Sequence, residues 1–458
     1  MPVIKLVVSD LHLADGHPIL DGFGERQLTA LQGLLQSTRP GGPIGDGSED
    51  VELIINGDCF DFLIIPPYET SGIATPTVAV EKLEKIIAAH RPFFHTLHEF
   101  LGIPGRHITF ITGNHDVELA FEQVRGGIQQ AIWEDAQRQD GILFCPTRFY
   151  RPLPDVYIEH GHHYDFWNHA DLWDEAGNPF SLQPERIPLP LGTQYVQRAA
   201  HQISEQYAYF DHFEPSLGSM RQIALLSLLN PPLVIETAQR TTSMMSYPYT
   251  PLANLAPGDE QVPVKLFEQA MLDFAAFQAD MIARKPEWKV IEDTLRTHPD
   301  APEDGQAADL AEFFELREYL TLPPAQAIRA ILAPKVYAMG ESVTRGMQNV
   351  LRNDSTLRYA IAGHTHILRQ DSLHGGAQTY LNIATWTLRQ GLPENEAITP
   401  ELQTWLRQPD NTAAPLRDLT QIVFALITAT EGSPSQACLC VWEGGKQGSF
   451  RILPQQKE

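Results

Sequence analysis

The stretch Ile108-Thr109-Phe110-Ile111-Thr112-Gly113-Asn114-His115-Asp116 sets the pattern for the whole chain. Its first five residues are apolar or β-branched, which predicts a buried strand at 108–112. Side chains that bind metals or carry protons follow at once. Because open α/β sheets gather their ligands at the carboxyl ends of their strands, this stretch predicts a functional loop at a sheet edge.

Four other strand-like runs end in the same way. They predict strands at 3–8, 51–55, 156–158 and 359–362. The polar clusters that follow them are Ser9-Asp10-Leu11-His12, Asn56-Gly57-Asp58, Glu159-His160-Gly161-His162 and Gly363-His364-Thr365-His366. Five clusters of metal-binding donors at five strand ends together predict a metal site.

Two of these clusters share a spacing that suits a metal. Asp10 and His12 are two residues apart, so in an extended segment both side chains project to the same side and can hold one ion. His364 and His366 repeat this spacing around Thr365. A single Asp-x-His or His-x-His pair is weak evidence, and the prediction depends on the whole set.

Length and charge set the class of protein. The 458 residues, 43% of them hydrophobic, allow a substantial core and roughly two or three domains. Acidic residues outnumber basic ones by 57 to 33, and the net charge of −24 opposes loose binding to nucleic acid or anionic membranes. Phosphate chemistry on such a chain needs a local positive source, which bound divalent cations supply.

The hydrophobic pattern and the cysteine content of the sequence indicate a reducing compartment. The chain has no apolar run of membrane-spanning length, and its first strand is interrupted by Lys5, unlike a secretory signal. We therefore expect a cytoplasmic protein without membrane partners. Four cysteines are too few for a disulfide scaffold, and Cys438 and Cys440 are expected to pack on one face of a strand.

The order of elements predicts an α/β architecture with an insertion. Helical patterns at 24–37, 80–101 and 127–138 alternate with strands in the first part, 1–164. Residues 165–356 read as a mostly helical insertion, with helices expected at 264–284 and 310–320. Strand patterns return in the second part, 357–458, at 379–383, 422–428, 437–442 and 450–453.

The set of motifs resembles the calcineurin-like metallophosphoesterase superfamily. The family pattern is Asp-x-His, Gly-Asp, Gly-Asn-His-Asp/Glu, His and Gly-His-x-His, and the match covers about the first 165 residues and about residues 357–388. The resemblance implies an α/β fold: a layered metallophosphoesterase β-sandwich flanked by helices, with the insertion as a cap.

The resemblance also implies a ligand set. Asp10, His12 and His366 hold one metal, Asn114, His160 and His364 hold the other, and Asp58 bridges them. Carboxylate, amide and imidazole donors suit Mn, Fe, Co, Ni or Zn better than Ca. Within Glu159-His160-Gly161-His162-His163 we choose His160 as the ligand, with His162 as the alternative; His163 and His169 would line the entrance or be structural.

The neighbouring residues have predicted roles of their own. His115 should donate a proton to the leaving oxygen or stabilise the phosphoryl oxyanion, and Asp116 should orient its ring. Asp61 is expected to be a hydrogen-bond partner rather than a ligand. Cys59-Phe60 follows Asp58, so the tyrosine ligand of purple acid phosphatases is absent, as is the Asp-Arg-Gly of serine/threonine protein phosphatases.

These features predict a dinuclear-metal-dependent phosphoesterase. It would hydrolyse a phosphomonoester, phosphodiester or pyrophosphate of a small molecule by attack of a metal-bridging hydroxide. Segments 57–62 and 380–386 are similar to the UDP-diacylglucosamine pyrophosphatase-like branch, although the longer insertion argues against a lipid substrate. Some arginines of the insertion are candidates for binding a phosphate or the rest of the substrate, and the alternative for each is a solvated surface charge: Arg186, Arg198, Arg221 and Arg240.

Two other functions fit parts of the sequence. A nuclease would use the same metal chemistry, and the acidic balance counts against it. A non-catalytic scaffold on the same fold would be expected to lose ligands or the catalytic histidine, whereas all seven predicted ligands and His115 are present.

Overall fold

The computed structural model describes residues 3–44, 50–133, 140–245, 316–332, 340–392, 398–409 and 416–454, apart from residues 19, 70, 166, 211, 214–218, 317 and 431. The fold is mixed α/β with several sheets. The chain forms two compact units. Unit 1 comprises Met1–Gln197, Val343–Leu388 and Thr420–Glu458, and unit 2 comprises Arg198–Ser342 and Arg389–Leu419.

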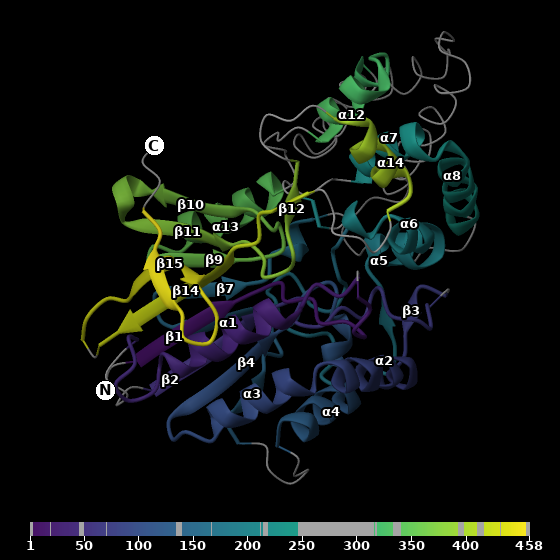
Figure 1. Ribbon diagram of the computed structural model, residues 1–458. Coiled ribbons are helices and arrows are strands. Elements are labelled where there is room, and N and C mark those ends of the chain that lie inside the picture. Colours follow the sequence, from purple (N-terminus) through teal and green to yellow (C-terminus); the bar gives the residue numbers. More distant parts are fainter. Residues whose placement is uncertain are drawn as a thin grey trace. The chain divides into compact units, whose positions relative to one another are not determined.

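A seven-stranded sheet forms the larger sheet of unit 1 (Figure 1), with the strand order β16-β15-β14-β1-β2-β4-β5. Four strands are parallel: β1 (Val3–Val8), β2 (Asp50–Asn56), β4 (Arg106–Ile111) and β5 (Ile142–Phe144). Three antiparallel strands complete it: β14 (Ile422–Ala429), β15 (Gln436–Glu443) and β16 (Ser449–Ile452). Val8 pairs with Ile55, and Asn56 pairs with Ile111, so β1, β2 and β4 end at nearly the same level.

A five-stranded sheet has the order β10-β11-β9-β7-β6. Its strands are β6 (Phe149–Leu153), β7 (Val156–Glu159), β9 (Tyr359–Ala362), β10 (Leu368–Leu373) and β11 (Gln378–Ile383). β9 lies between β7 and β11 and is parallel to both. Consequently the loops after β7 and β9 leave the same edge of the sheet, although Asp165 of the first loop and His364 of the second are 199 positions apart.

Burial of apolar side chains joins these elements. One core cluster contains Val7 and Ile54 from the larger sheet together with Ile158 and Ile361 from the smaller one, so the two sheets share a buried layer. A second cluster joins the larger sheet to the helices α1 (Glu25–Gln36), α2 (Pro76–Ala89), α3 (Arg91–Leu101) and α4 (Glu122–Trp133). A third packs α13 (Glu341–Asn353) against the smaller sheet.

Short elements complete unit 1. They are η1 (Val117–Ala120), η2 (His162–Tyr164), η5 (His374–Gly376), α5 (Leu191–Tyr195) and the two-stranded pair of β3 (Ile73–Ala74) with β8 (Ile187–Pro188). The π-helix η3 (Val196–Ala200) crosses from unit 1 into unit 2.

Unit 2 is mostly helical where it is described. Its helices are α6 (His201–Gln206), η4 (Ala208–Phe210), α7 (Ser219–Leu229), α8 (Pro231–Met245), α12 (Pro324–Leu332) and α14 (Pro400–Arg407). A short pair of strands, β12 (Gln390–Gly391) and β13 (Arg417–Asp418), belongs to it as well. The helix predicted at 264–284 lies outside the described residues, and so does most of 310–320.

The predicted strands are confirmed, and two predicted helices differ in extent. The pattern at 80–101 is two helices, α2 and α3, which meet at His90. Pro92 lacks a backbone N–H and fits the first turn of a new helix better than the interior of a continuous one. The helix predicted at 127–138 begins earlier, at Glu122, and its described part ends at Trp133. The sequence analysis did not predict β5, β6 and β10 or the two-residue strands β3, β8, β12 and β13.

The boundaries of the compact units differ from the domain boundaries predicted from the sequence. Ala170, Trp173 and Ile187 are buried in the core of unit 1, so the segment after 164 still belongs to that unit. Most of α13 belongs there too, because Val343, Met347 and Leu351 pack on the smaller sheet. Residues 389–419, by contrast, join unit 2.

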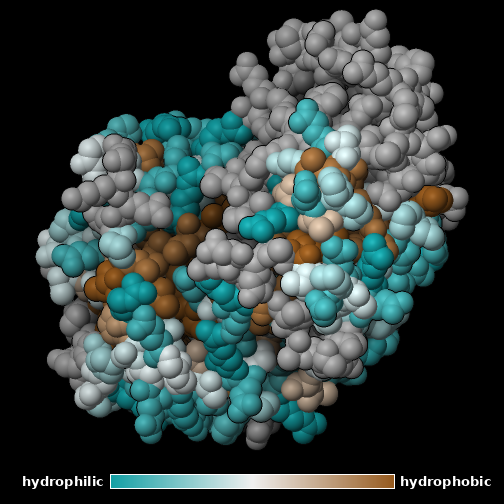
Figure 2. Space-filling view, turned by 45° about the horizontal axis from the view of Figure 1, so that its top comes forward, coloured by the Kyte–Doolittle hydropathy of each residue, from teal (hydrophilic) through white to brown (hydrophobic). Residues whose placement is uncertain are grey.

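The surface agrees with the charged composition. Figure 2 shows one face on which most coloured residues are hydrophilic or neutral, with one larger area of hydrophobic residues and several smaller ones. Among the described residues, no helix combines the length and the apolar character needed to cross a membrane.

Candidate metal centre

The strand ends bring the predicted site residues together. Asp10, Asp58 and Asn114 follow the parallel strands β1, β2 and β4. The first two loops are joined directly, because the Asp10 N–H donates to the Gly57 carbonyl at 3.2 Å and the His12 N–H donates to the Asp58 carbonyl at 2.9 Å.

The smaller sheet contributes the remaining predicted ligands. His160 follows β7, and His364 and His366 follow β9. The His364 N–H lies 3.2 and 3.1 Å from the two carboxylate oxygens of Asp10, so the loops of the two sheets are in contact. Residues that are 354 positions apart in the chain therefore meet in one site.

One group of side chains that can hold a metal ion consists of Asp10, His12 and His366, with donor atoms all within 4.8 Å of one another. His366 Nε2 lies 3.1 Å from Asp10 Oδ1 and 3.3 Å from His12 Nε2. His12 Nε2 is 3.9 Å from the same carboxylate oxygen. Three donors therefore face a common point.

A second group consists of Asp58, His160 and His364. His160 Nε2 lies 3.1 Å from Asp58 Oδ2, yet this buried nitrogen has no hydrogen-bond partner, and neither has the buried Oδ1 of Asn114. A buried polar atom without a partner is costly, whereas a cation would satisfy both atoms. Asp58 Oδ2 is also 3.8 Å from His12 Nε2, so Asp58 lies between the two groups.

His160 and His162 differ in how their rings are held. His160 Nδ1 donates to the carbonyl oxygen of Asn56 at 2.8 Å, so Nε2 is the nitrogen that can bind a cation once the ring is neutral. His162 is buried with neither ring nitrogen partnered, and it belongs to none of the metal-type groups among the described residues. Burial and the neighbouring His160 hold the pKa of His162 well below its usual value.

The backbone is unusual at the predicted ligands. Seven described non-glycine residues have positive φ, and five of them are predicted ligands: Asp10, His12, Asp58, His364 and His366, with φ between 49° and 66°. L-residues avoid this region at a cost on the order of 1–3 kcal/mol each, and such strain clusters at functional sites. The left-handed turns aim consecutive ligands into one site.

Two motif glycines allow close approach at the site. Gly57 has φ +77°, and a Cβ there would collide with the ring of His160. A Cβ at Gly113 would collide with the carboxylate of Asp58. Only glycine lets these loops approach the side chains so closely.

The structure corrects the prediction for Asp116. Its carboxylate is fully buried and accepts backbone N–H groups from Gly113 at 2.6 Å and from Cys59 at 2.8 Å, so it does not orient His115. Asp61 contacts the ring instead, because its Oδ1 lies 3.0 Å from His115 Nδ1. Asp61 thus makes the contact expected of a hydrogen-bond partner, and the expectation that it is not a ligand stays a prediction. The donor atoms of Asp61, His12 and His115 also lie within 4.8 Å of one another, close enough to hold an ion.

The carboxylates and imidazoles of the site shift each other's pKa values. Burial alone would raise the pKa of Asp10, but His160, His12 and His366 hold it far below its ordinary value. Burial would likewise raise the pKa of Asp58, and the charges of His160 and His115 hold it well below that value. For His160, burial lowers the pKa while the charges of Asp58 and Asp10 raise it to about 9. The site thus keeps its carboxylates ionised and favours positive charge.

Residues that the sequence analysis did not single out support Asp10. Ser9 Oγ donates to Asp10 Oδ2 at 2.5 Å and also contacts the carbonyl of Asn56. Thr385 Oγ1 and the Trp386 N–H both donate to the Asp10 carbonyl, at 2.9 and 3.2 Å. Thr385 and Trp386 lie in segment 380–386, for which the sequence suggested a resemblance to a family branch but no role at the site.

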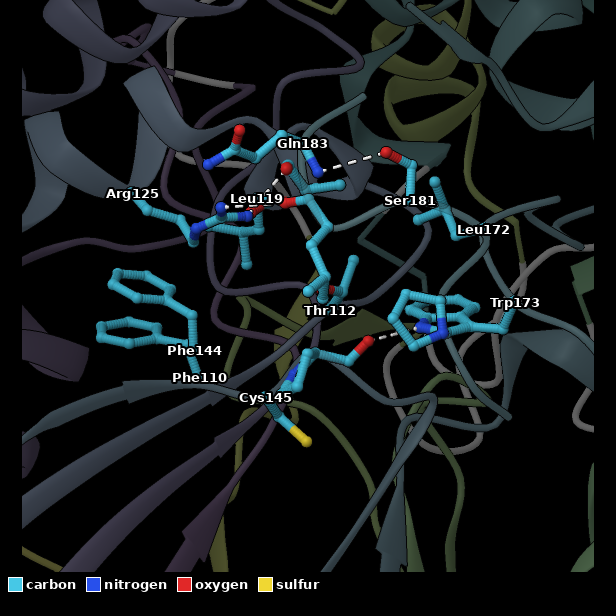
Figure 3. A pocket seen from close by; sticks show the side chains of 14 residues that line it. Phe110, Thr112, Leu119, Arg125, Phe144, Cys145, Leu172, Trp173, Ser181 and Gln183 are labelled. Carbon is cyan, nitrogen blue, oxygen red and sulfur yellow. Dashed lines mark hydrogen bonds between the residues drawn. The ribbon is translucent and has the colours of Figure 1, made fainter. Parts of the chain in front are cut away.

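A separate cavity of about 300 Å³ lies at the β4–β5 edge of the larger sheet. Figure 3 shows the rings of Phe110 and Phe144 on one side and Trp173 on the other. The Arg125 guanidinium in its wall already donates to the carbonyls of Leu119 and Ala120. The cavity is therefore mostly apolar, and the guanidinium in its wall is already engaged.

The four arginines proposed as substrate ligands have different surroundings. Arg221 is buried and donates to the Ile331 carbonyl at 2.5 Å, and Arg240 pairs with Glu236 at 2.6 Å, so these two have structural partners within unit 2. Arg186 is exposed and Arg198 is half-buried. Among the four candidates, Arg221 is therefore the least available to a substrate.

Comparisons with known proteins give little further information. No protein-family model matches the chain, and no curated protein matches it. Among solved structures, the chain is similar to a dimetal phosphatase from Danio rerio, with 13% sequence identity, 98% of each chain covered and a TM-score of 0.28. A likeness this weak carries no argument about the present chain.

Proposed function

We propose that this chain is a dinuclear-metal-dependent phosphoesterase of the calcineurin-like superfamily, acting on a phosphomonoester, phosphodiester or pyrophosphate of a small molecule. One observation carries the proposal. The Asp58 carboxylate lies between two groups of ligating side chains, 3.1 Å from His160 Nε2 and 3.8 Å from His12 Nε2. A carboxylate shared in this way suits a pair of cations.

In this proposal each cation has its own ligands. Asp10, His12 and His366 would hold the first, Asn114, His160 and His364 would hold the second, and Asp58 would be shared by both. The mixed oxygen and nitrogen donors suit Mn, Fe, Co, Ni or Zn. When bound, such cations activate water and neutralise charge on the phosphoryl oxygens.

The chain itself supplies acid catalysis. His115 Nδ1 faces Asp61 at 3.0 Å, which leaves Nε2 free to donate a proton to the leaving oxygen. Burial would lower the pKa of His115, but the charges of Asp61 and Asp58 raise it, which favours the protonated form that an acid needs. Its side chain is 24% exposed, so a substrate can reach it.

The architecture forms part of the same proposal. The two sheets that share a buried layer would be the metallophosphoesterase β-sandwich, and the insertion predicted at residues 165–356 would select the substrate. The three-part division at residues 164 and 356 stays a prediction. A cytoplasmic location fits the four cysteines, which are all free thiols.

Turnover of model esters tests the proposal. Purified full-length protein loaded with Mn²⁺ is assayed with p-nitrophenyl phosphate and bis-p-nitrophenyl phosphate, beside an Asp58→Asn variant. We expect metal-dependent hydrolysis of at least one ester and its loss in the variant. Full metal loading without hydrolysis of either ester would favour a non-catalytic scaffold, and failure to bind metal would reject the centre itself.

A further inference from the structure

The loop after η2 carries two polar side chains that touch the second group of predicted ligands. Asp165 Oδ2 lies 3.0 Å from His364 Nε2, and Asn168 Oδ1 accepts a hydrogen bond from Asn114 Nδ2 at 3.2 Å. Asn168 Nδ2 donates to Asp165 Oδ2 at 2.7 Å, which joins the two contacts. Asp165 and Asn168 thus connect ligand candidates from β4 and β9.

The contact with Asn168 decides which end of the Asn114 amide faces the site. The Nδ2 of Asn114 is used as a donor to Asn168, so Oδ1 points the other way, where it is buried and has no partner. Only the amide oxygen has lone pairs for a cation. Without the Asn168 oxygen as an acceptor, the two orientations of the Asn114 amide would not be distinguished at this position.

The contact with Asp165 has the same effect on an imidazole. A carboxylate facing His364 Nε2 holds the proton on that nitrogen and leaves Nδ1 as the lone-pair donor. Carboxylates that fix the tautomer and orientation of metal-binding histidines in this way commonly strengthen metal affinity.

The loop that carries these side chains is itself well held. The Trp167 N–H donates to Asp165 Oδ1 at 3.0 Å, and the Asn168 N–H donates to the Asp165 carbonyl at 3.2 Å. The Gly192 N–H donates to the Trp167 carbonyl at 2.6 Å, which ties the loop to α5. Asp165 and Asn168 therefore have fixed positions from which to orient their neighbours.

We propose that Asp165 and Asn168 are positioning residues that select the ligating atoms of His364 and Asn114 at the second cation. This inference rests on the proposed function, because it needs a cation at that place. It assigns a role to a loop in which the sequence motifs predict no ligand.

Metal titration of the full-length protein tests the inference without relying on turnover. Mn²⁺ binding is followed by calorimetry, and the number of bound ions is checked by elemental analysis. Asp165→Asn and Asn168→Ala should each weaken the second Mn²⁺ about 10- to 100-fold and leave the first unchanged. Because the two residues act through one network, the double variant should lose less than the sum of the single losses.

Asp171→Asn is the matched control. Asp171 Oδ1 lies 3.3 Å from His169 Nε2, and its side chain is 28% exposed against 29% for Asp165, yet His169 is not a predicted ligand. This variant should bind both ions as the wild type does. Circular dichroism shows whether each variant is folded, and the truncation Asn168→Ala, at a half-buried position, keeps the test available if Asp165→Asn unfolds.

The outcomes separate this inference from the proposed function. If the wild type and both variants bind two Mn²⁺ ions with equal affinity, the positioning role is overturned and the proposed function stands. If the wild type itself binds fewer than two ions, the dinuclear centre fails and the positioning role fails with it.

Discussion

The Asp61 carboxylate joins two imidazoles: Oδ2 lies 3.1 Å from His12 Nδ1, and Oδ1 lies 3.0 Å from His115 Nδ1. The same carboxylate therefore contacts a predicted metal ligand and the proposed acid. Both contacts use Nδ1 and leave the two Nε2 atoms for the cation and the substrate. Burial would raise the pKa of Asp61, but His115 and His12 lower it, so the carboxylate stays ionised.

Replacing Asp61 with Asn should impair acid catalysis. The substitution removes a charge that raises the pKa of His115, so the proton is lost at a lower pH. We expect the alkaline limb of the kcat/KM profile to move to lower pH and kcat to fall about 10- to 100-fold. The loss should be larger for phenyl phosphate than for p-nitrophenyl phosphate, because phenolate needs protonation more.

Asp354→Asn is the control for this variant, since Asp354 pairs with Arg151 and is 33% exposed on the surface. Its profile should match that of the wild type. An Asp61→Asn enzyme with an unshifted alkaline limb would show that Asp61 does not act on His115.

Removing the metals should lower the stability of unit 1 as well as its activity. Ions that bind only the folded chain stabilise it by about 2.7 kcal/mol when free metal is a hundred times Kd. Treatment with a chelator should therefore lower Tm, and Mn²⁺ should restore it. Asp58→Asn should have a Tm that responds much less to Mn²⁺; an equal response in both proteins would mean that the ions bind elsewhere.

Metal affinity should increase with pH. In the ion-free site His160 has a pKa raised to about 9, and a histidine must lose this proton before Nε2 or Nδ1 can bind a cation. Binding then releases a proton, and Mn²⁺ affinity should rise by up to about tenfold per pH unit below 9. Calorimetry in buffers of different ionisation enthalpy measures the released protons. Affinity that stays constant from pH 6 to 8 would contradict this prediction.

Local sequence patterns were enough to predict the strand ends and the side chains that meet there. Buried strands such as 108–112 are recognisable from composition alone, and parallel strands necessarily end at a common edge. The clusters around Asp10, Asp58 and His364 do lie together in the structure. Their individual roles as ligands stay predictions.

Contacts that depend on the path of the backbone in three dimensions could not be predicted from the sequence. Asp61 and Asp116 are both acidic neighbours of the motifs, and only the path of the backbone shows that Asp116 accepts N–H groups while Asp61 faces His115. Asp165 meets His364 across 199 residues of chain, and no local pattern marks such a pair. The boundaries of the compact units depend on similar distant packing, as for Trp173.

Glu118 on η1 should make stability depend on pH. It is 2% exposed, and burial, opposed by Lys82 and helped by Glu69, raises its pKa to about 8 from 4.5. Between these values the folded chain keeps a proton that the unfolded chain loses. The contribution of Glu118 to the free energy of unfolding is therefore fully present below pH 4.5. It declines toward pH 8 by about 1.4 kcal/mol per pH unit.

Glu118→Gln should remove that decline, because the amide stays neutral in both states. We expect the difference in Tm between pH 5 and pH 8 to shrink in this variant. Glu122→Gln, at an exposed position in the first turn of α4, should leave the difference unchanged. Equal pH dependence in Glu118→Gln and wild type would show that Glu118 is ionised in the folded protein at neutral pH.

Gly57→Ala should displace His160. The new Cβ would collide with the imidazole ring and lie 2.8 Å from His160 Cβ, and φ of +77° adds a backbone cost on the order of 1–2 kcal/mol. We expect a lower Tm and loss of the second Mn²⁺, measured by thermal unfolding and elemental analysis.

Gly126→Ala is the matched control, because a Cβ at this exposed position of α4 meets nothing within 4 Å. The alanine should stabilise the helix by up to about 1 kcal/mol. A Gly57→Ala protein that still binds two Mn²⁺ ions would show that the position of His160 in this structure is not needed for the centre.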